Sequence, residues 1–249
     1  MKKVFTALFI SLLDSSYAFT QEFIISPAIG YAGMGFIGDV KTEVTTVSNT
    51  TPPVKISVSD TVSAVSSMNL MEIGVTSGRI SKNGFTFMFS TFVAPTTGSG
   101  KATVKSPKVS KELVFTRDIK KGLELGVSAI FGYTFKSLDN KLYFNIGSGL
   151  AGRFMLPDSY YGDAKFNKHA AEEACIGIPI QAGVQYFFTD SFGINVLVAD
   201  ELGVGIFNMG ENKVKTVPVT ITTTFDGLGF SNVFSVKVGP VFKIGAKKR

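Results

Sequence analysis

Apolar and polar residues alternate along several segments of the chain, each about ten residues long or longer. Between Cys175 and Phe188 the even positions are apolar or aromatic, whereas the odd positions, apart from Phe187, are small or polar. Successive strand side chains point to opposite faces, so the pattern predicts a strand between an apolar and a polar environment. Seven other segments show the same alternation, more weakly in the first, second and sixth: 22–37, 67–78, 84–94, 123–136, 142–154, 192–207 and 231–245.

The length of these segments favours a membrane barrel. A tilted strand needs about ten residues to cross a bilayer, whereas strands of soluble sandwiches are nearer five or six. In lipid every backbone N–H and C=O needs a protein partner, so a spanning sheet must close on itself. We therefore predict an all-β fold, a closed antiparallel transmembrane up-and-down β-barrel of about eight strands. A soluble sandwich or a lipocalin-like barrel is the alternative.

The connections between the predicted strands alternate in length. An exported barrel has short periplasmic turns and long external loops, and an even number of strands gives that order. Segment 112–122 also has the character of a strand, but we assign it to the second long loop, and a ten-strand barrel stays open. The short connections are 79–83, 137–140 and 189–191, and the long ones are 38–66, 95–121, 155–174 and 208–230.

Several charged residues fall on the predicted inner face. An eight-stranded barrel has an interior just wide enough to be filled by side chains, and unpaired charges there are costly. We expect carboxylate–cation pairs that fill the lumen; a narrow polar pathway is the functional alternative. Glycines on the same face leave room for larger side chains. The lumen candidates are Glu72, Glu124, Arg153, Glu201 and Lys237, and the glycines are Gly126, Gly132, Gly147, Gly149, Gly183 and Gly205.

Two further expectations concern the outer face. Strict alternation directs Asp200 towards lipid, unless a β-bulge at Asp200 and Glu201 turns both residues inward. The chain has no Trp, so the aromatic belt at the membrane interfaces must come from Tyr and Phe. The tyrosines that we expect in this belt are Tyr31, Tyr133, Tyr143 and Tyr186.

The N-terminus has the order of a secretory signal peptide. Lys2 and Lys3 precede a ten-residue apolar run, 4–13, which is too short to span a membrane. Ser16 and Ala18 provide a small-x-small cleavage site. We predict cleavage after Ala18, which divides the chain into a signal peptide, 1–18, and a barrel, 19–249.

Composition excludes several classes of function. The net charge is +6, without a dense basic run before 247–249, so we expect no nucleic-acid binding. One Cys cannot form an internal disulfide, and one His six positions before it makes a poor zinc site. We expect no metal, no cofactor and no catalysis. The alternative is a lipid-modifying enzyme that uses Ser159, Asp163 and His169 in the third long loop.

Over nearly all of residues 19–249 the chain resembles small eight-stranded bacterial outer-membrane barrels of the OmpW-like, OmpX/opacity-like and OmpA-transmembrane types. Residues 183–205, GVQYFFTDSFGINVLVADELGVG, resemble a strand–turn–strand unit near the end of those barrels. Residues 237–244, KVGPVFKI, resemble their assembly signal, although residues 245–249 follow where many members end on an aromatic residue. The positions that match the signal are Lys237, Gly239, Phe242 and Ile244.

This resemblance implies a monomeric outer-membrane protein whose partners are membrane lipid and the barrel-assembly machinery. The expected role is structural, or that of a narrow channel for small solutes, hydrophobic ones included. The alternative is an adhesin that contacts host surface molecules through its external loops.

Overall fold

The structure, a computed structural model, describes residues 20–48, 55–104, 113–161, 164–165, 173–216 and 219–244. These residues form eight long strands and one strand of two residues. The strands are β1 (Thr20–Ser48), β2 (Lys55–Ser81), β3 (Phe85–Val104), β4 (Leu113–Lys136), β5 (Leu142–Tyr161), β6 (Ala164–Lys165), β7 (Glu173–Phe187), β8 (Phe192–Thr216) and β9 (Val219–Ile244).

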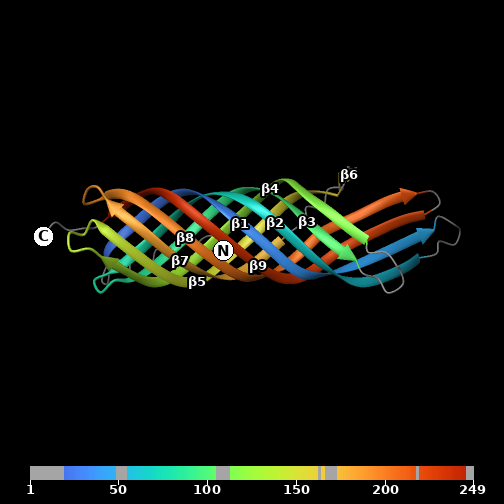
Figure 1. Cartoon of the computed structure of the whole chain (residues 1–249), viewed down its shortest axis with the longest axis horizontal. Coiled ribbons are helices and arrows are strands. Elements are labelled where there is room, and N and C mark those ends of the chain that lie inside the picture. The colour runs from blue at the N-terminus through green and yellow to red at the C-terminus, as the bar shows by residue number, and fades with distance from the viewer. Residues whose placement is uncertain are drawn as a thin grey trace, which may run out of the picture.

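The eight long strands close into one barrel. Each pairs antiparallel with its neighbours in the order β4-β3-β2-β1-β9-β8-β7-β5, and the pairing of β4 with β5 completes the circle. β1 begins and β9 ends at the end of the barrel that carries the three short turns, which we call the turn end (Figure 1). The predicted closed eight-strand barrel is confirmed, and within the described ranges the ten-strand alternative is wrong.

The polarity of the wall is that of a membrane protein. The outward side chains of β7 and of Phe188, which directly follows it, are apolar or aromatic from Ile176 to Phe188, and most of them are exposed. At a rise of ~3.3 Å per residue and a tilt of about 45°, this run covers roughly 28 Å, close to the ~25 Å apolar band of outer-membrane barrels. A soluble barrel would bury this surface, so the lipocalin-like alternative is wrong.

No helix that is long and apolar enough to cross a membrane occurs in the described ranges.

The three short turns lie where the sequence predicts them. The β2–β3 turn contains Gly84, whose φ of 90° suits glycine, and the β4–β5 turn contains Asn140, whose φ is 53°. In the second turn, the Ser137 hydroxyl and the Lys141 backbone N–H both donate to the Asp139 carboxylate. These hydrogen bonds favour the ionised form and lower the pKa of Asp139.

The predicted long loops are largely strand. Segment 112–122, which we assigned to a loop, pairs with both β3 and β5 as the first part of β4, so that assignment is wrong. β1 and β2 stay in register up to Val47 and Lys55. β8 and β9 stay paired up to Thr216 and Val219, with one register shift between Asn208 and Glu211. The strands extend beyond the predicted ends because a strand can continue as long as its neighbour offers backbone hydrogen bonds, inside or outside the membrane.

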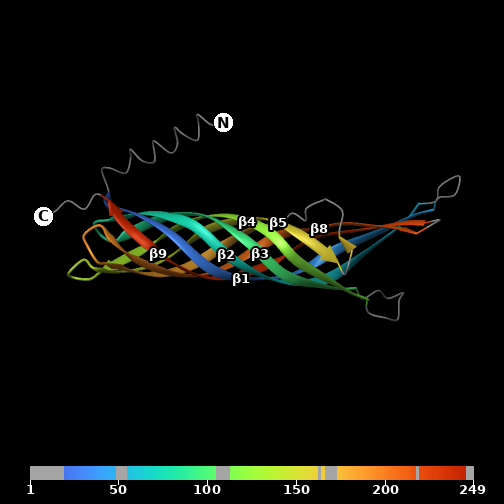
Figure 2. The ribbon, with the colours of Figure 1, turned by 90° about the horizontal axis from the view of Figure 1, so that it is seen from above.

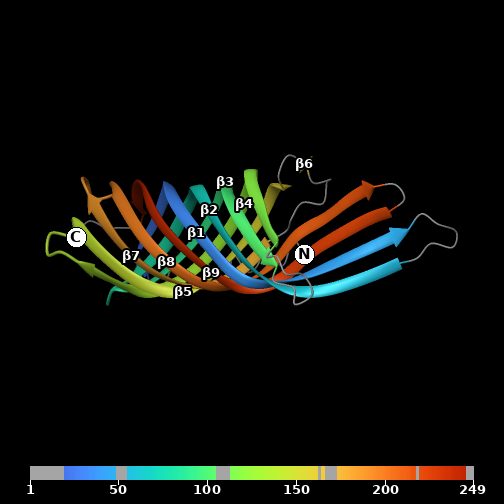
Figure 3. The same ribbon diagram turned by 45° about the vertical axis from the view of Figure 1, so that its right-hand side comes forward.

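The extended ends of β8, β9, β1 and β2 form a sheet beyond the rest of the barrel (Figures 2 and 3). We call this four-stranded extension the projecting sheet: residues 39–48, 55–63, 208–216 and 219–226.

Candidate functional site: the filled lumen

An ionic cluster lies in the middle of the lumen. Arg153 Nη1 lies 2.9 Å from Glu72 Oε1 and 2.6 Å from Glu124 Oε1, and its Nε lies 2.9 Å from Glu201 Oε2. Lys237 Nζ lies 2.5 Å from the second oxygen of Glu72. The five charged residues on the predicted inner face, contributed by five different strands, thus meet in one place, and we call them the ionic cluster.

Phe92 supports both cations of the cluster. Its ring centroid lies 4.7 Å from the Arg153 guanidinium carbon and 4.4 Å from Lys237 Nζ, within the range of cation–π interactions. Gly126 makes room for the ring, because a Cβ at that position would lie 1.9 Å from it. Our sequence analysis did not single out Phe92. The alternation of the sequence could have identified Phe92, because Phe89 and Val93 lie on the outer face and Phe92 therefore falls on the inner one.

The cluster contains more negative than positive groups. Three carboxylates, Glu72, Glu124 and Glu201, share the two cations Arg153 and Lys237. Glu72 contacts both cations, whereas Glu124 contacts one nitrogen that it shares with Glu72. Oε2 of Glu124 and Oε1 of Glu201 are buried without a hydrogen-bond partner. Glu124 is therefore the carboxylate whose negative charge is least balanced by neighbouring cations.

Apolar side chains fill the lumen above the cluster, on the side of the projecting sheet. They come from β1, β2, β3, β5 and β9 and are almost completely buried. Together with the ionic cluster, this apolar layer fills the lumen between the described strands. Its members are Ala32, Met34, Met68, Leu70, Ala94, Met155 and Val233.

A second polar group, the clasp, closes the lumen at the turn end. Lys136 Nζ lies 2.9 Å from Glu22 Oε2, and the Tyr143 hydroxyl donates to Glu22 Oε1 over 3.0 Å. Lys243 Nζ donates to the Tyr143 hydroxyl over 3.1 Å and lies 4.4 Å from the ring centroid of Phe187. The clasp joins the first and last strands across the lumen to β4, β5 and β7.

Comparison with protein families decides the affiliation of the chain. Residues 19–244 match the family model described as "Domain of unknown function (DUF2715)". The chain belongs to this family. No curated protein matches the sequence.

Several solved structures resemble the DUF2715 barrel at low sequence identity. Ail, the attachment invasion locus protein of Yersinia pestis, is 12% identical and covers 84% of this chain and 97% of its own, with a TM-score of 0.32. Neisserial surface protein A is 15% identical, and the match covers 78% of this chain and 95% of its own, with a TM-score of 0.28. The translocator domain of the autotransporter NalP from Neisseria meningitidis is 8% identical, and the match covers 92% of this chain and 95% of its own, with a TM-score of 0.31.

One of the four predicted belt tyrosines lies elsewhere in the DUF2715 barrel. Tyr143 is fully buried in the clasp, so its placement in the outer belt is wrong. Its neighbours Leu142 and Phe144 face outward, and alternation should have outweighed residue type at this position. Tyr31, Tyr133 and Tyr186 do face outward.

Most of the aromatic belt at the turn end consists of Phe. Ring centroids lie 4.8 Å apart for Tyr133 and Phe135, and 5.4 Å apart for Tyr186 and Phe188. Aromatic side chains at this height are typical of a membrane–water interface.

Asp200 follows the alternation and faces outward. Ile180 pairs with Asp200 and Pro179 pairs with Glu201 in an unbroken register, so the alternative of a bulge at these positions is wrong. The exposed Asp200 carboxylate accepts a hydrogen bond of 2.8 Å from the Asn232 amide. This bond provides part of the compensation that a carboxylate needs on this face.

The four positions of the resembled assembly signal lie on β9 at the seam with β1. Phe242 and Ile244 face outward, Lys237 belongs to the ionic cluster, and Gly239 closely approaches β1. A Cβ on Gly239 would lie 1.9 Å from the carbonyl oxygen of Pro27. The glycine therefore has a packing role at the seam, besides any role in assembly.

Prolines interrupt the hydrogen-bond ladder at the same seam. Register pairs run to Ile25 and Phe242 and resume at Ile29 and Val238. Pro27 and Pro240, which have no N–H to donate, lie in the gap. From the lumen side, the Ser26 hydroxyl donates to the Pro240 carbonyl over 2.9 Å and so replaces part of the missing ladder.

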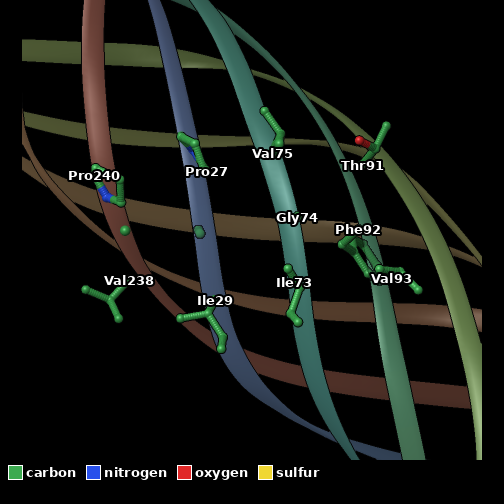
Figure 4. Close-up of a pocket in the computed structure, with 12 residues that line it drawn as sticks. Pro27, Ile29, Ile73, Gly74, Val75, Thr91, Phe92, Val93, Val238 and Pro240 are labelled. Carbon is green, nitrogen blue, oxygen red and sulfur yellow. The ribbon is translucent and has the colours of Figure 1, made fainter.

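An open groove of about 700 Å³ covers this interruption on the outer wall (Figure 4). Residues of β9, β1, β2 and β3 line it, most of them apolar, including Ile29, Ile73, Val75, Val93 and Val238. These outward side chains belong to the lipid-facing band, so we expect lipid chains to fill the groove.

The described residues do not test the catalytic alternative. Ser159 belongs to β5, where only its backbone is described, and Asp163 and His169 lie outside the described residues. The described part of the chain has no group of three or more His, Cys, Asp or Glu suited to a metal ion. The predicted signal peptide, 1–18, also lies outside the described residues.

Proposed function

We propose that this protein is a non-enzymatic, monomeric barrel of the bacterial outer membrane that acts at the cell surface through its projecting sheet. Its lumen serves as a filled structural support. In this proposal membrane lipid surrounds the apolar band, the barrel-assembly machinery inserts the chain, and the sheet contacts macromolecules outside the cell. The signal-peptide pattern at the N-terminus supports export.

The observation that carries the proposal is a change of polarity along β1. Within the barrel, its outward residues include Ile29, Tyr31 and Ile37. Beyond Ile37 the sequence positions of the same parity, 39, 41 and 43, are charged. Charges on this face have no place in hydrocarbon, so the projecting sheet lies above the membrane.

The other face of the projecting sheet has an apolar sequence. By register and alternation it continues the lumen side of the barrel wall, and its positions carry mostly Val, Ile, Thr and Phe, with one acidic residue, Asp60. A large apolar face outside the membrane is typical of a surface that contacts another macromolecule. The apolar residues at these register positions are Val40, Val44, Ile56, Val58, Val62, Val214, Val219, Ile221 and Phe225.

Paired substitutions on the two faces test this proposal. Val44 and Val58 are direct register partners on the apolar face, and Thr45 and Ser57 are partners on the polar face. With the full chain displayed on a bacterium without adhesins of its own, we expect attachment to cultured animal cells. Val44→Asp with Val58→Asp should abolish it, whereas Thr45→Asp with Ser57→Asp should leave it intact.

Heat-dependent migration on a denaturing gel shows that each displayed variant is folded. Equal attachment of both folded variants would contradict the proposal, as would no attachment of the unsubstituted protein.

A narrow channel for small solutes, hydrophobic ones included, is the second candidate. It is favoured by one observation, a layer of buried amides between the clasp and the ionic cluster: Asn145, Gln185 and Asn195. Polar lumen groups suit a passage for small molecules, but the ionic and apolar layers above them oppose it. Conductance separates the two candidates.

A further inference from the structure

The buried amides form one group on three adjacent strands. Asn145 lies on β5, Gln185 on β7 and Asn195 on β8, and each side chain is at most 3% exposed. Gln185 pairs directly with Asn195, and Asn145 pairs with Gly183, two residues away from Gln185. We call these three side chains the amide layer.

Four of the six polar side-chain atoms of the amide layer lack a hydrogen-bond partner among the described residues. Asn195 Nδ2 donates to Ser26 Oγ over 3.2 Å. Asn145 Oδ1, Gln185 Oε1 and Asn195 Oδ1 have no donor, and Asn145 Nδ2 has no acceptor among the described residues. Buried polar atoms without partners are costly, so four of them on three neighbouring amides indicate a bound molecule. That molecule must supply three donors and one acceptor.

The charges around the layer decide the chemistry of this molecule. The clasp lies next to it, since Tyr143 pairs directly with Gln185. The clasp itself holds two cations and one carboxylate, since Lys136 contacts Glu22 and Lys243 contacts the Tyr143 hydroxyl, so it is unsuited to a further cation. An anion only accepts hydrogen bonds, so it would leave the three oxygens unsatisfied. A small neutral molecule that both donates and accepts meets the requirement.

We propose that the amide layer binds a small cluster of ordered water molecules, enclosed between the clasp and the ionic cluster. Each water donates to amide oxygens and accepts from Asn145 Nδ2, as buried waters do in polar cavities. The water lies only in the amide layer, with the clasp on one side and the ionic cluster on the other. This site is independent of the proposed contact surface, since it lies inside the barrel.

Cross-relaxation between water and side-chain amides, measured by NMR on the full chain folded in detergent micelles, tests the proposal. The NH₂ groups of Asn145, Gln185 and Asn195 should give direct cross-peaks with water. Gln181 provides a matched internal control, because it is also buried but its Nε2 contacts Met88 Sδ at 3.8 Å. Its cross-peak should be clearly weaker.

Two variants sharpen the measurement. Asn145→Leu removes two of the four unpartnered atoms, and the water cross-peaks of Gln185 and Asn195 should weaken strongly, whereas Gln181→Leu should leave them unchanged. Cross-peaks of the amide layer no stronger than that of Gln181 in the unsubstituted protein would overturn the proposal, even if Asn145→Leu does not fold. Cross-peaks to a buffer solute in place of water would overturn it as well.

Discussion

At the scale of single residues, Arg153 holds the lumen together. It is the common partner of three carboxylates on three other strands, and it is buried. Removing one partner of a buried ion pair leaves uncompensated charge behind. Arg153→Ala should lower the free energy of unfolding by roughly 3–5 kcal/mol, measured by urea titration in detergent or vesicles. Lys141→Ala, in an exposed turn, is the control, and an equal loss in both would contradict the role of Arg153.

The carboxylates of the cluster should respond unequally to neutralisation. Glu72 contacts two cations, whereas Glu124 contacts one and brings an excess negative charge into the lumen. Glu124→Gln should therefore change the free energy of unfolding little, and Glu72→Gln should lower it clearly. The same urea titration checks the order. A larger loss for Glu124→Gln would show that contact number does not decide the stability of the cluster.

Alternation alone predicted which charged residues face the lumen, because side-chain direction follows from parity along a strand. It did not predict which of them meet, since the stagger between strands decides whether Arg153 reaches Glu72 on the far side of the barrel. Tyr143 was misplaced because its residue type was given more weight than its parity.

At the scale of elements, close contact at the seam of β1 and β9 should control closure of the barrel. A methyl group on Gly239 would meet the backbone of β1, whereas a Cβ on Gly33 would have no atom within 4 Å. Gly239→Ala should thus reduce the yield of heat-modifiable, folded barrel, and Gly33→Ala should not. The ratio of folded to unfolded bands after refolding measures this, and equal yields would refute a steric role for Gly239.

The projecting hairpins should be dispensable for the barrel. Val40 and Val62 are register partners, so replacement of residues 41–61 by Asn-Gly rejoins β1 and β2 with a tight turn. This shortened chain should fold with unchanged heat-dependent migration, because the lumen layers and the clasp remain. Failure to fold in micelles would show that the barrel depends on the projecting sheet.

Strand ends were harder to predict than strand centres. The alternation that identifies a membrane strand depends on lipid on one side. In β1 it is lost beyond Ile37, where the sequence has charged residues at positions 39, 41 and 43. Segment 112–122 was assigned to a loop because a further spanning strand would break the alternation of short and long connections. In the structure its residues from Leu113 onward lengthen β4 and add no further strand to the barrel.

At the scale of the whole molecule, the protein is a membrane barrel whose lumen is closed by packed layers of side chains. Conductance across planar bilayers formed from floated proteoliposomes tests it most directly, with insertion and folding verified by heat-dependent migration of the same vesicles. A closed lumen should give no stable conductance steps with the unsubstituted protein. Reproducible steps from folded, inserted barrels would contradict the closed lumen.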